Sequence, residues 1–194
     1  MNVGNYYQRR NLEAQTHRLA SIDDSTYTFI ADDMAIDDSL GLGEFRGNVV
    51  YKSKDTLGFD LLANNIKTDK KKSALLATEL PLLLIKQTKD TLYVSADTLY
   101  SGKVSDLKRP FPNARDSVGK MTDSTLDKYF EAFHHVQVYS DSLQAKCDSL
   151  FYALSDSTIR LISKPIVWAN NNQITGDTIY MYVQNKKPEQ LNVF

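Results

Sequence analysis

Cysteine, histidine and excess positive charge are all scarce in this chain, and each absence removes a class of protein. Cys147 is the only cysteine, so an internal disulfide is excluded. The three histidines do not stand at zinc-ligand spacings from Cys147, so we expect no metal site and no cofactor. The net charge of -1 lacks the broad attraction that nucleic-acid binders use, so we expect no nucleic-acid partner.

Long apolar runs are missing as well. No stretch approaches the roughly 18 apolar residues that span a bilayer, and residues 1–20 lack the apolar core of a signal peptide. Tyr6 and Tyr7 already begin a strand-like pattern close to Met1. We therefore expect a soluble fragment from which flanking regions, an export signal among them, were removed.

The pattern that the chain does contain is a period of two. In the segment 45–52, Phe45, Val49 and Tyr51 share one face, whereas Arg46 and Lys52 share the other. Similar alternation recurs over 56–63, 142–147 and 178–183, and no equally clean helical stripe competes with it. The sequence therefore predicts an all-β fold of repeated short antiparallel strands.

Aspartate marks the expected turns. A triplet of Asp, then Ser or Thr, then Leu or Ile is predicted to be a turn entering a strand, because the carboxylate can accept a hydrogen bond from the backbone two residues on. Spacings of seven residues between two pairs of triplets predict very short strands between tight turns. The triplets begin at Asp38, Asp55, Asp90, Asp97, Asp141, Asp148 and Asp177.

One order of landmarks appears twice along the chain. F-R-G-N-V-V-Y at 45–51 matches F-H-H-V-Q-V-Y at 133–139. In each half a proline then opens an apolar strand, at Pro81 and at Pro165. We predict a single domain over 1–194 with two internal repeats, about 23–102 and 129–184, separated by a loop-rich insertion at 103–127. Stacked strands of this kind leave open ends, which must be covered or paired with another molecule.

These motifs resemble the OstA-like (organic solvent tolerance) family of lipopolysaccharide-transport proteins, of the periplasmic bridge type in a Bacteroidetes-like variant. The resemblance rests on F-R-G-N-V-V-Y at 45–51, A-D-T-L-Y at 96–100 and I-T-G-D-T-I-Y at 174–180. His134-His135 replaces the Gly-Asn pair of the motif, and Asn64 replaces an aspartate. The resemblance implies an open β-jellyroll folded like a taco shell, with an apolar interior that takes acyl chains.

The same resemblance implies a function and a set of partners. The chain would be a non-enzymatic periplasmic module that shields acyl chains and joins end to end into a bridge to the outer membrane. Its partners would be lipopolysaccharide or a similar glycolipid, other envelope transport proteins at the terminal strands, and further copies of the chain. The residues expected to line the lipid-binding groove are Phe29, Phe45, Val49, Leu57, Phe59, Leu61, Leu92, Val94, Leu143, Ile159, Leu161, Ile166, Trp168, Ile179 and Met181.

Other chemistry finds little support in the sequence. His134 and His135 are adjacent on a strand and would point to opposite faces, so they are predicted to be structural. The doublets Asp23-Asp24, Asp32-Asp33 and Asp37-Asp38 lack the spacing of a calcium loop and are predicted to be solvated turns. Lys70-Lys71-Lys72 is predicted to be a solvated turn, with lipid phosphate binding as the alternative. We find no nucleophile elbow and no phosphate loop, so we expect no enzyme.

Two other functions stay open at the level of the sequence. A structural or adhesive envelope module would close the same apolar faces on themselves, and its core would be full of side chains. A carbohydrate-active β-domain would use aspartates with aromatics such as Trp168, Tyr180 and Tyr182. The volume of the interior separates the first from a carrier, and a hydrolysis assay would test the second.

Overall fold

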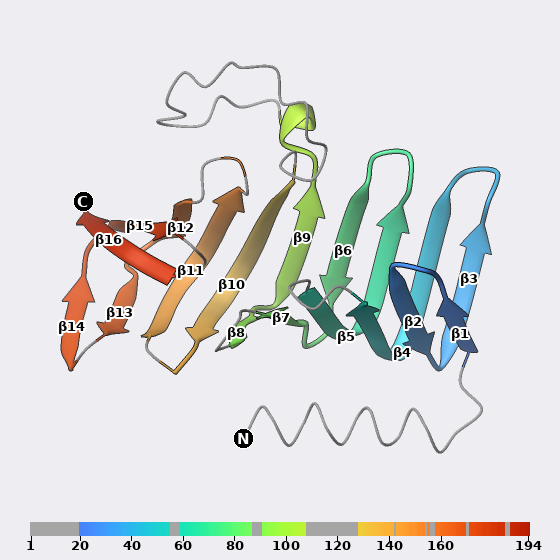
Figure 1. Cartoon of the computed structure of the whole chain (residues 1–194), viewed down its shortest axis with the longest axis horizontal. Coiled ribbons are helices and arrows are strands. Elements are labelled where there is room, and N and C mark those ends of the chain that lie inside the picture. Colours follow the sequence, from blue (N-terminus) through green and yellow to red (C-terminus); the bar gives the residue numbers. More distant parts are fainter. Residues whose placement is uncertain are drawn as a thin grey trace.

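The computed structural model describes residues 20–54, 59–86, 91–107, 128–141, 143–153, 155, 158–169, 171–184 and 187–194. They form one 16-stranded sheet in which every pairing is antiparallel, and Val104–Asp106 (η1) forms a single turn of 3-10 helix (Figure 1). The prediction of an all-β fold of repeated antiparallel strands is therefore confirmed. The strands are β1 (Ala20–Asp23), β2 (Tyr27–Ala31), β3 (Asp33–Asp37), β4 (Leu42–Ser53), β5 (Phe59–Asp69), β6 (Ala74–Thr78), β7 (Leu82–Lys86), β8 (Thr91–Ser95), β9 (Thr98–Gly102), β10 (Tyr129–Tyr139), β11 (Leu143–Ala153), β12 (Thr158–Ile162), β13 (Ile166–Ala169), β14 (Asn172–Thr175), β15 (Thr178–Gln184) and β16 (Lys187–Val193).

The sheet is bent along one line, so that it doubles back on itself as two layers that are joined at the bend. Four long strands, β4, β5, β10 and β11, cross the bend and contribute one half to each layer. Layer 1 also holds β3, β6, β9, β12, β15 and β16. Layer 2 also holds β1, β2, β7, β8, β13 and β14. We call the line of bends the crease.

The direction in which the strands of each layer run changes gradually along the sheet, as Figure 1 shows. Near β3 the strands of layer 1 stand upright in this view. The strands of layer 2 lie at the lower ends of the layer 1 strands and look shortened, because they point partly toward the viewer. Near β14 the strands of layer 2 are upright, whereas β12 and β15 are short in this view and β16 runs obliquely across it. A steady twist between neighbouring strands, typical of sheets of L-residues, accounts for this change.

The crease follows a rule of direction. Where the backbone passes from layer 2 to layer 1, it bends at one residue. Where it passes from layer 1 to layer 2, it bends at two consecutive residues with positive φ. Neighbouring strands are antiparallel, so they cross the crease in opposite directions, and the chirality of L-residues makes those directions inequivalent. The single-residue bends are Asp32, Asn64, Asp97, Asp148 and Asp177, and the two-residue bends are Gly47-Asn48, Glu79-Leu80, His134-His135 and Ser163-Lys164.

Backbone hydrogen bonds join a single-residue bend to the two-residue bend beside it. The N–H of Asp32 donates to the carbonyl of Gly47 at 2.9 Å, and the N–H of Asn64 donates to Glu79 at 3.0 Å. The N–H of Asp97 donates to the carbonyl of His134 at 3.0 Å. His134-His135 and Asn64 thus occupy the same kinds of bend as the Gly-Asn pair and the aspartates whose places they take.

The aspartate triplets prove to have two structural roles. Asp38 lies in the turn between β3 and β4, as predicted, but Asp97 and Asp177 lie at the crease. Asp148 lies inside β11, so the prediction of a very short strand between two tight turns at 141 and 148 is wrong. The strand continues because the crease bends it without interrupting its pairing. The triplets at 55 and 90 begin outside the described residues.

Proline opens a strand at both predicted places. Pro81 and Pro165 directly precede β7 and β13, and both side chains are fully buried. Each follows a two-residue bend, where the missing N–H takes no hydrogen bond away from a continuing ladder. Of the predicted insertion, residues 103–107 contain the 3-10 turn, and 108–127 lie outside the described residues.

Gly47 is the bend residue with the least room for a side chain. Its φ is 67°, and a Cβ there would collide with the carboxylate of Asp32. We expect Gly47→Ala to lower the free energy of unfolding by about 1–2 kcal/mol or more, from left-handed strain and the collision together. Denaturant unfolding measures the loss. Glu79→Gly at an equivalent exposed bend should not destabilise, and equal losses in both variants would contradict the explanation.

Candidate functional site

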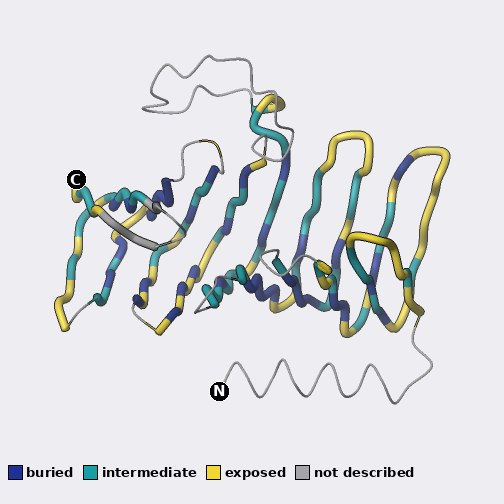
Figure 2. The backbone as a smooth tube through the Cα atoms, viewed as in Figure 1, coloured by how far each residue is buried: buried dark blue, intermediate teal, exposed yellow. Residues whose placement is uncertain are grey.

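The candidate site is the apolar interior between the two layers. Alternation along each strand places one set of side chains inside, and buried positions recur along the strands of both layers (Figure 2). Among the predicted groove residues, ten belong to this interior cluster and are buried. They are Phe29, Phe45, Val49, Leu61, Val94, Leu143, Ile159, Leu161, Ile179 and Met181.

The other five predicted residues divide into three groups. Phe59 and Leu92 are partly buried and pack against the interior cluster. Ile166 and Trp168 lie on the outer face, because their neighbour Val167 is the residue of β13 that points inward. Trp168 Nε1 instead donates to Gln173 Oε1 at 2.9 Å on that outer face, so the inward placement of these two residues is corrected. Leu57 lies outside the described residues.

Several interior residues were not predicted. The apolar run at 82–85 is buried on both faces, so alternation does not reveal that Leu83 is the inner residue and Leu82 and Leu84 are outer ones. The position of the bend at the crease determines which residue after Pro81 points inward, so a signal for the bend would have identified Leu83 as an inner residue. The other missed members of the interior cluster are Ala31, Ala63, Ile66, Ala77, Leu99, Ala132, Val136, Val138, Ala145, Leu150 and Val167.

Aromatic rings join the two layers across the interior. Phe29 of layer 2 stacks on Phe45 of layer 1 with ring centroids 4.2 Å apart. Phe59 of layer 2 meets Phe130 of layer 1 edge to face at 5.5 Å. Both Phe59 and Phe130 lie at the strand ends far from the crease, so this pair closes the interior at its mouth.

The two ends of the sheet leave apolar side chains uncovered. At the edge strand β3, Ile36 is 46% exposed, and at β16 Val193 is 46% exposed. Ile36 pairs in register with Gly43, and Val193 pairs with Ile179, so both continue the inner face. The apolar interior therefore reaches both ends of the described sheet.

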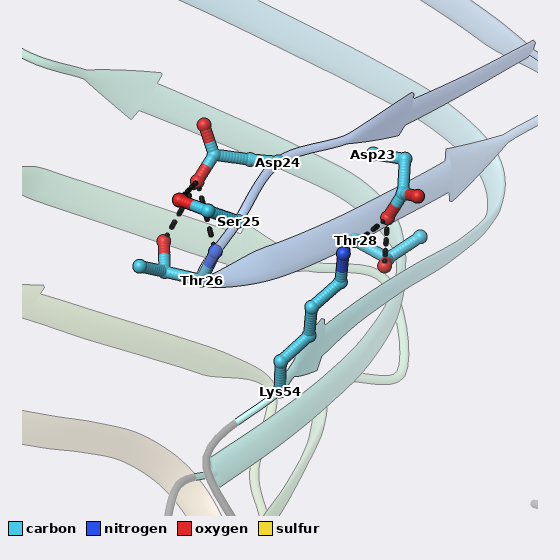
Figure 3. Close-up of polar contacts among 6 residues, drawn as sticks. All are labelled: Asp23, Asp24, Ser25, Thr26, Thr28 and Lys54. Carbon is cyan, nitrogen blue, oxygen red and sulfur yellow. Dashed lines mark hydrogen bonds and ion pairs between the residues drawn. The ribbon is translucent and has the colours of Figure 1, made fainter.

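The acidic doublets serve turns and ion pairs. Asp24 Oδ1 accepts hydrogen bonds from the N–H of Thr26 at 3.0 Å and from its hydroxyl at 2.9 Å (Figure 3). Asp23 Oδ1 lies 2.7 Å from Lys54 Nζ and accepts a hydrogen bond from Thr28. Among the described residues, no group of three histidine, cysteine, aspartate or glutamate side chains is placed to hold a metal ion.

The lysine run at 70–72 lies in the turn between β5 and β6, as predicted. Lys70 Nζ lies 3.4 Å from Asp38, and Lys71 Nζ donates to the carbonyl of Ser39 at 3.2 Å. Lys72 pairs with Asp69 at 3.5 Å. These contacts tie the turn to its neighbour between β3 and β4, and all three amines remain exposed.

Two histidines at the crease pair with aspartates of the flanking bends. His135 Nδ1 lies 2.8 Å from Asp97 Oδ2, and His134 Nδ1 lies 3.1 Å from Asp148 Oδ1. The hydrogen bond to Asp97, followed by its negative charge, raises the pKa of His135 above its ordinary value. Beside them, burial raises the pKa of the Cys147 thiol to about 12, so this cysteine stays protonated.

The His135–Asp97 pair predicts a pH dependence of stability. The raised pKa means that the pair stabilises the fold fully below about pH 6.5, the ordinary value, and that this contribution is lost as pH rises through the higher folded value. We expect the thermal midpoint to fall between pH 6 and 8, and His135→Gln to flatten that slope. An unchanged slope in the variant would show that the pair is not responsible.

The described part of the chain contains no helix that is long and apolar enough to cross a membrane. Comparison with known protein families and with curated proteins gives no match. Among solved structures, the chain is similar to the crystal structure of LptH, described as the LptA homologous periplasmic component of the lipopolysaccharide transport device from Pseudomonas aeruginosa. The sequences are 16% identical, the match covers 86% of this chain and 80% of that chain, and the TM-score is 0.31.

Proposed function

We propose that this chain carries lipopolysaccharide or a similar glycolipid through the periplasm, with the acyl chains between the two layers and the sugars outside. The observation that carries this proposal is the apolar inner face, which continues from β2 to β16 without a break. Within the described residues, strand pairing links the layers only through the strands that cross or meet at the crease. The layers can therefore spread at the mouth without losing ladder hydrogen bonds.

Free energies of burial favour the opening of the mouth by a lipid. Separating an aromatic pair such as Phe59–Phe130 costs about 0.5–1.5 kcal/mol beyond the buried area. Each acyl methylene that enters gains about 0.8 kcal/mol, so ten of them gain about 8 kcal/mol. The lipid term exceeds the aromatic term several-fold, which supports a closed empty state and an open loaded one.

The ends of the sheet support a bridge. Ile36 at one end and Val193 at the other extend the apolar inner face to the edge strands. An edge strand that pairs with another module would cover these side chains and would join two interiors into one path. The proposed partners are other envelope transport proteins and further copies of this chain, and no enzymatic step is required.

A structural envelope module is the second candidate function. The specific observation in its favour is that the empty interior is already filled: Leu161, Ile179 and Val49 are 0% exposed, and rings from both layers are in contact. Such a module would use the same ends for assembly and would never open. A lipid-capture experiment separates the two functions.

We expect a photo-crosslinking residue at Phe59 to capture lipopolysaccharide when the full chain is produced in a lipopolysaccharide-making bacterium. Phe59 is partly buried at the mouth and faces the interior. The matched control is Lys52, which is exposed on the outer face of layer 2, one residue from the inner Tyr51. Capture at 59 but not at 52, read by gel shift with a lipid-specific antibody, supports the carrier. Equal capture at both positions, or none at either with the fold intact by circular dichroism, would leave the structural module.

A further inference from the structure

A further pocket of about 350 Å³ opens at the crease, and its lining combines outer-face residues with Val136 and Cys147, which belong to or pack against the interior cluster. Its lining comes from β10, β11 and β13 and from the bend between β12 and β13. The polar residues that line it are His135, Gln137, Lys146, Ser163 and Lys164. Lys146 occupies the middle, since it pairs in register with Gln137 on one side and with Ile166 on the other.

The charges around this pocket favour an anion. Lys146 and Lys164 are both exposed, and neither has a carboxylate within 4 Å in the part of the chain that the structure describes. Of the acids at the neighbouring bends, Asp97 pairs with His135 at 2.8 Å and Asp148 pairs with His134 at 3.1 Å, whereas Asp177 meets the pocket's bend through its backbone carbonyl, which accepts a hydrogen bond from the N–H of Lys164 at 3.3 Å. The ammonium groups of Lys146 and Lys164 therefore border the same pocket, and within the described residues neither is paired with a carboxylate. The hydroxyl of Ser163 and the side-chain amide of Gln137 line the pocket beside them.

The matching position in the first predicted repeat shows that the fold does not require these charges. Counted from the bends, Gln137, Lys146 and Ile166 correspond to Val50, Leu62 and Leu82, which pair with one another in the same register. Those three side chains are 1%, 0% and 8% exposed and form a buried apolar cluster. Lys164 corresponds in the same way to Leu80.

One backbone arrangement thus holds an apolar cluster in one repeat and a cationic hollow in the other. The first repeat carries leucine at the places of Lys146 and Lys164, so the backbone arrangement itself does not require the lysines. Lysine ammonium groups act as point charges toward phosphate oxygens, and the serine and glutamine side chains can donate to the same oxygens.

We propose that this pocket binds a phosphate group, carried either by a soluble phosphorylated sugar or by a lipid headgroup. Lys146 and Lys164 supply the charge, and Gln137 and Ser163 supply neutral hydrogen bonds. The side chains that supply these contacts lie on the opposite side of the sheet from the interior, so the site stands or falls independently of acyl-chain binding.

The test uses the full chain and three probes at low ionic strength. Inorganic phosphate, glucose 1-phosphate and phosphatidylcholine vesicles containing phosphatidic acid are titrated, with amide chemical shifts and calorimetry as readouts. We expect the amide signals of Gln137, Lys146 and Ser163 to move, and added sodium chloride to weaken binding. Binding of only the first two probes identifies a soluble source, and binding of the vesicles as well identifies a headgroup; either result supports the site.

The decisive variant places the first repeat's residues in the second. Lys146→Leu with Lys164→Leu is expected to weaken binding at least about tenfold, because both charge-assisted contacts are lost. Lys52→Leu removes one ammonium group from the outer face of the first repeat and should leave affinity unchanged, whereas either single substitution at Lys146 or Lys164 should lower it. Circular dichroism confirms that the variants fold, as expected for exposed positions. Equal affinity in the double variant, or no response of the wild-type chain to any probe, would overturn the proposal.

Discussion

Leu161→Glu is expected to unfold the ligand-free protein, or to remove most of its stability. Leu161 is 0% exposed in β12, and its register partners Leu150 and Ile179 are interior residues as well. A carboxylate there is denied water, and the side chains beside it in register are apolar, so the loss is on the order of 3–5 kcal/mol. Domains of this size are typically stable by only about 5–15 kcal/mol.

The adjacent residue is the natural control for this substitution. Ile162 lies on the outer face of the same strand and is 38% exposed, so Ile162→Glu should change stability by no more than about 0.5 kcal/mol. Urea unfolding followed by circular dichroism measures both variants. If Leu161→Glu keeps a stable fold, water reaches the interior of the empty protein, and the closed interior described above is wrong.

Lys86→Met is expected to destabilise the protein by about 3 kcal/mol. Lys86 Nζ lies 2.7 Å from Asp60 Oδ1, and the Asp60 side chain is only 2% exposed. The N–H of Ser53 also donates to Asp60 at 3.1 Å, so the carboxylate is held in place. Removing the lysine takes an ammonium group at 2.7 Å away from a buried carboxylate, and this effect is usually larger than the net value of the ion pair.

Removing both charges should restore most of that stability. Asp60 and Lys86 border the outer apolar cluster of Val50, Leu62 and Leu84, so Asp60→Leu with Lys86→Met extends an apolar surface that is already buried. A double-mutant cycle in urea gives the coupling between the two changes. Additive losses, with the double variant less stable than either single variant, would show that the two charges do not act as a pair.

Part of the candidate site could be predicted from the sequence, and particular residues show why. Phe45, Val49 and Tyr51 are inner residues as the alternation indicates, because the two-residue bend between them preserves the phase of the strand. Proline opens the strand at 166–169 without marking its phase, so the sequence does not show whether Ile166 and Trp168 or their neighbours point inward. Val167 took the inner place, since the bend at Ser163-Lys164 fixed the direction of the first residue after it.

The crease itself was not visible in the sequence. Gly47-Asn48, Glu79-Leu80, His134-His135 and Ser163-Lys164 share no residue type, yet all of them have positive φ at the same line of the sheet. A bend of this kind is imposed by neighbouring strands that must all turn together. Only the pairing of each strand with the next reveals it.

The sequence by itself determined that this protein is built from antiparallel strands, and it indicated ten of the buried side chains that form the interior, because a period of two is a local property of the chain. The tertiary structure decided where the strands bend, which face of the apolar run at 82–85 points inward, and that Lys146 and Lys164 line the same pocket. These features depend on register between strands far apart in sequence, such as Lys146 with Ile166 and Leu62 with Leu82, and local patterns carry no information about such pairing.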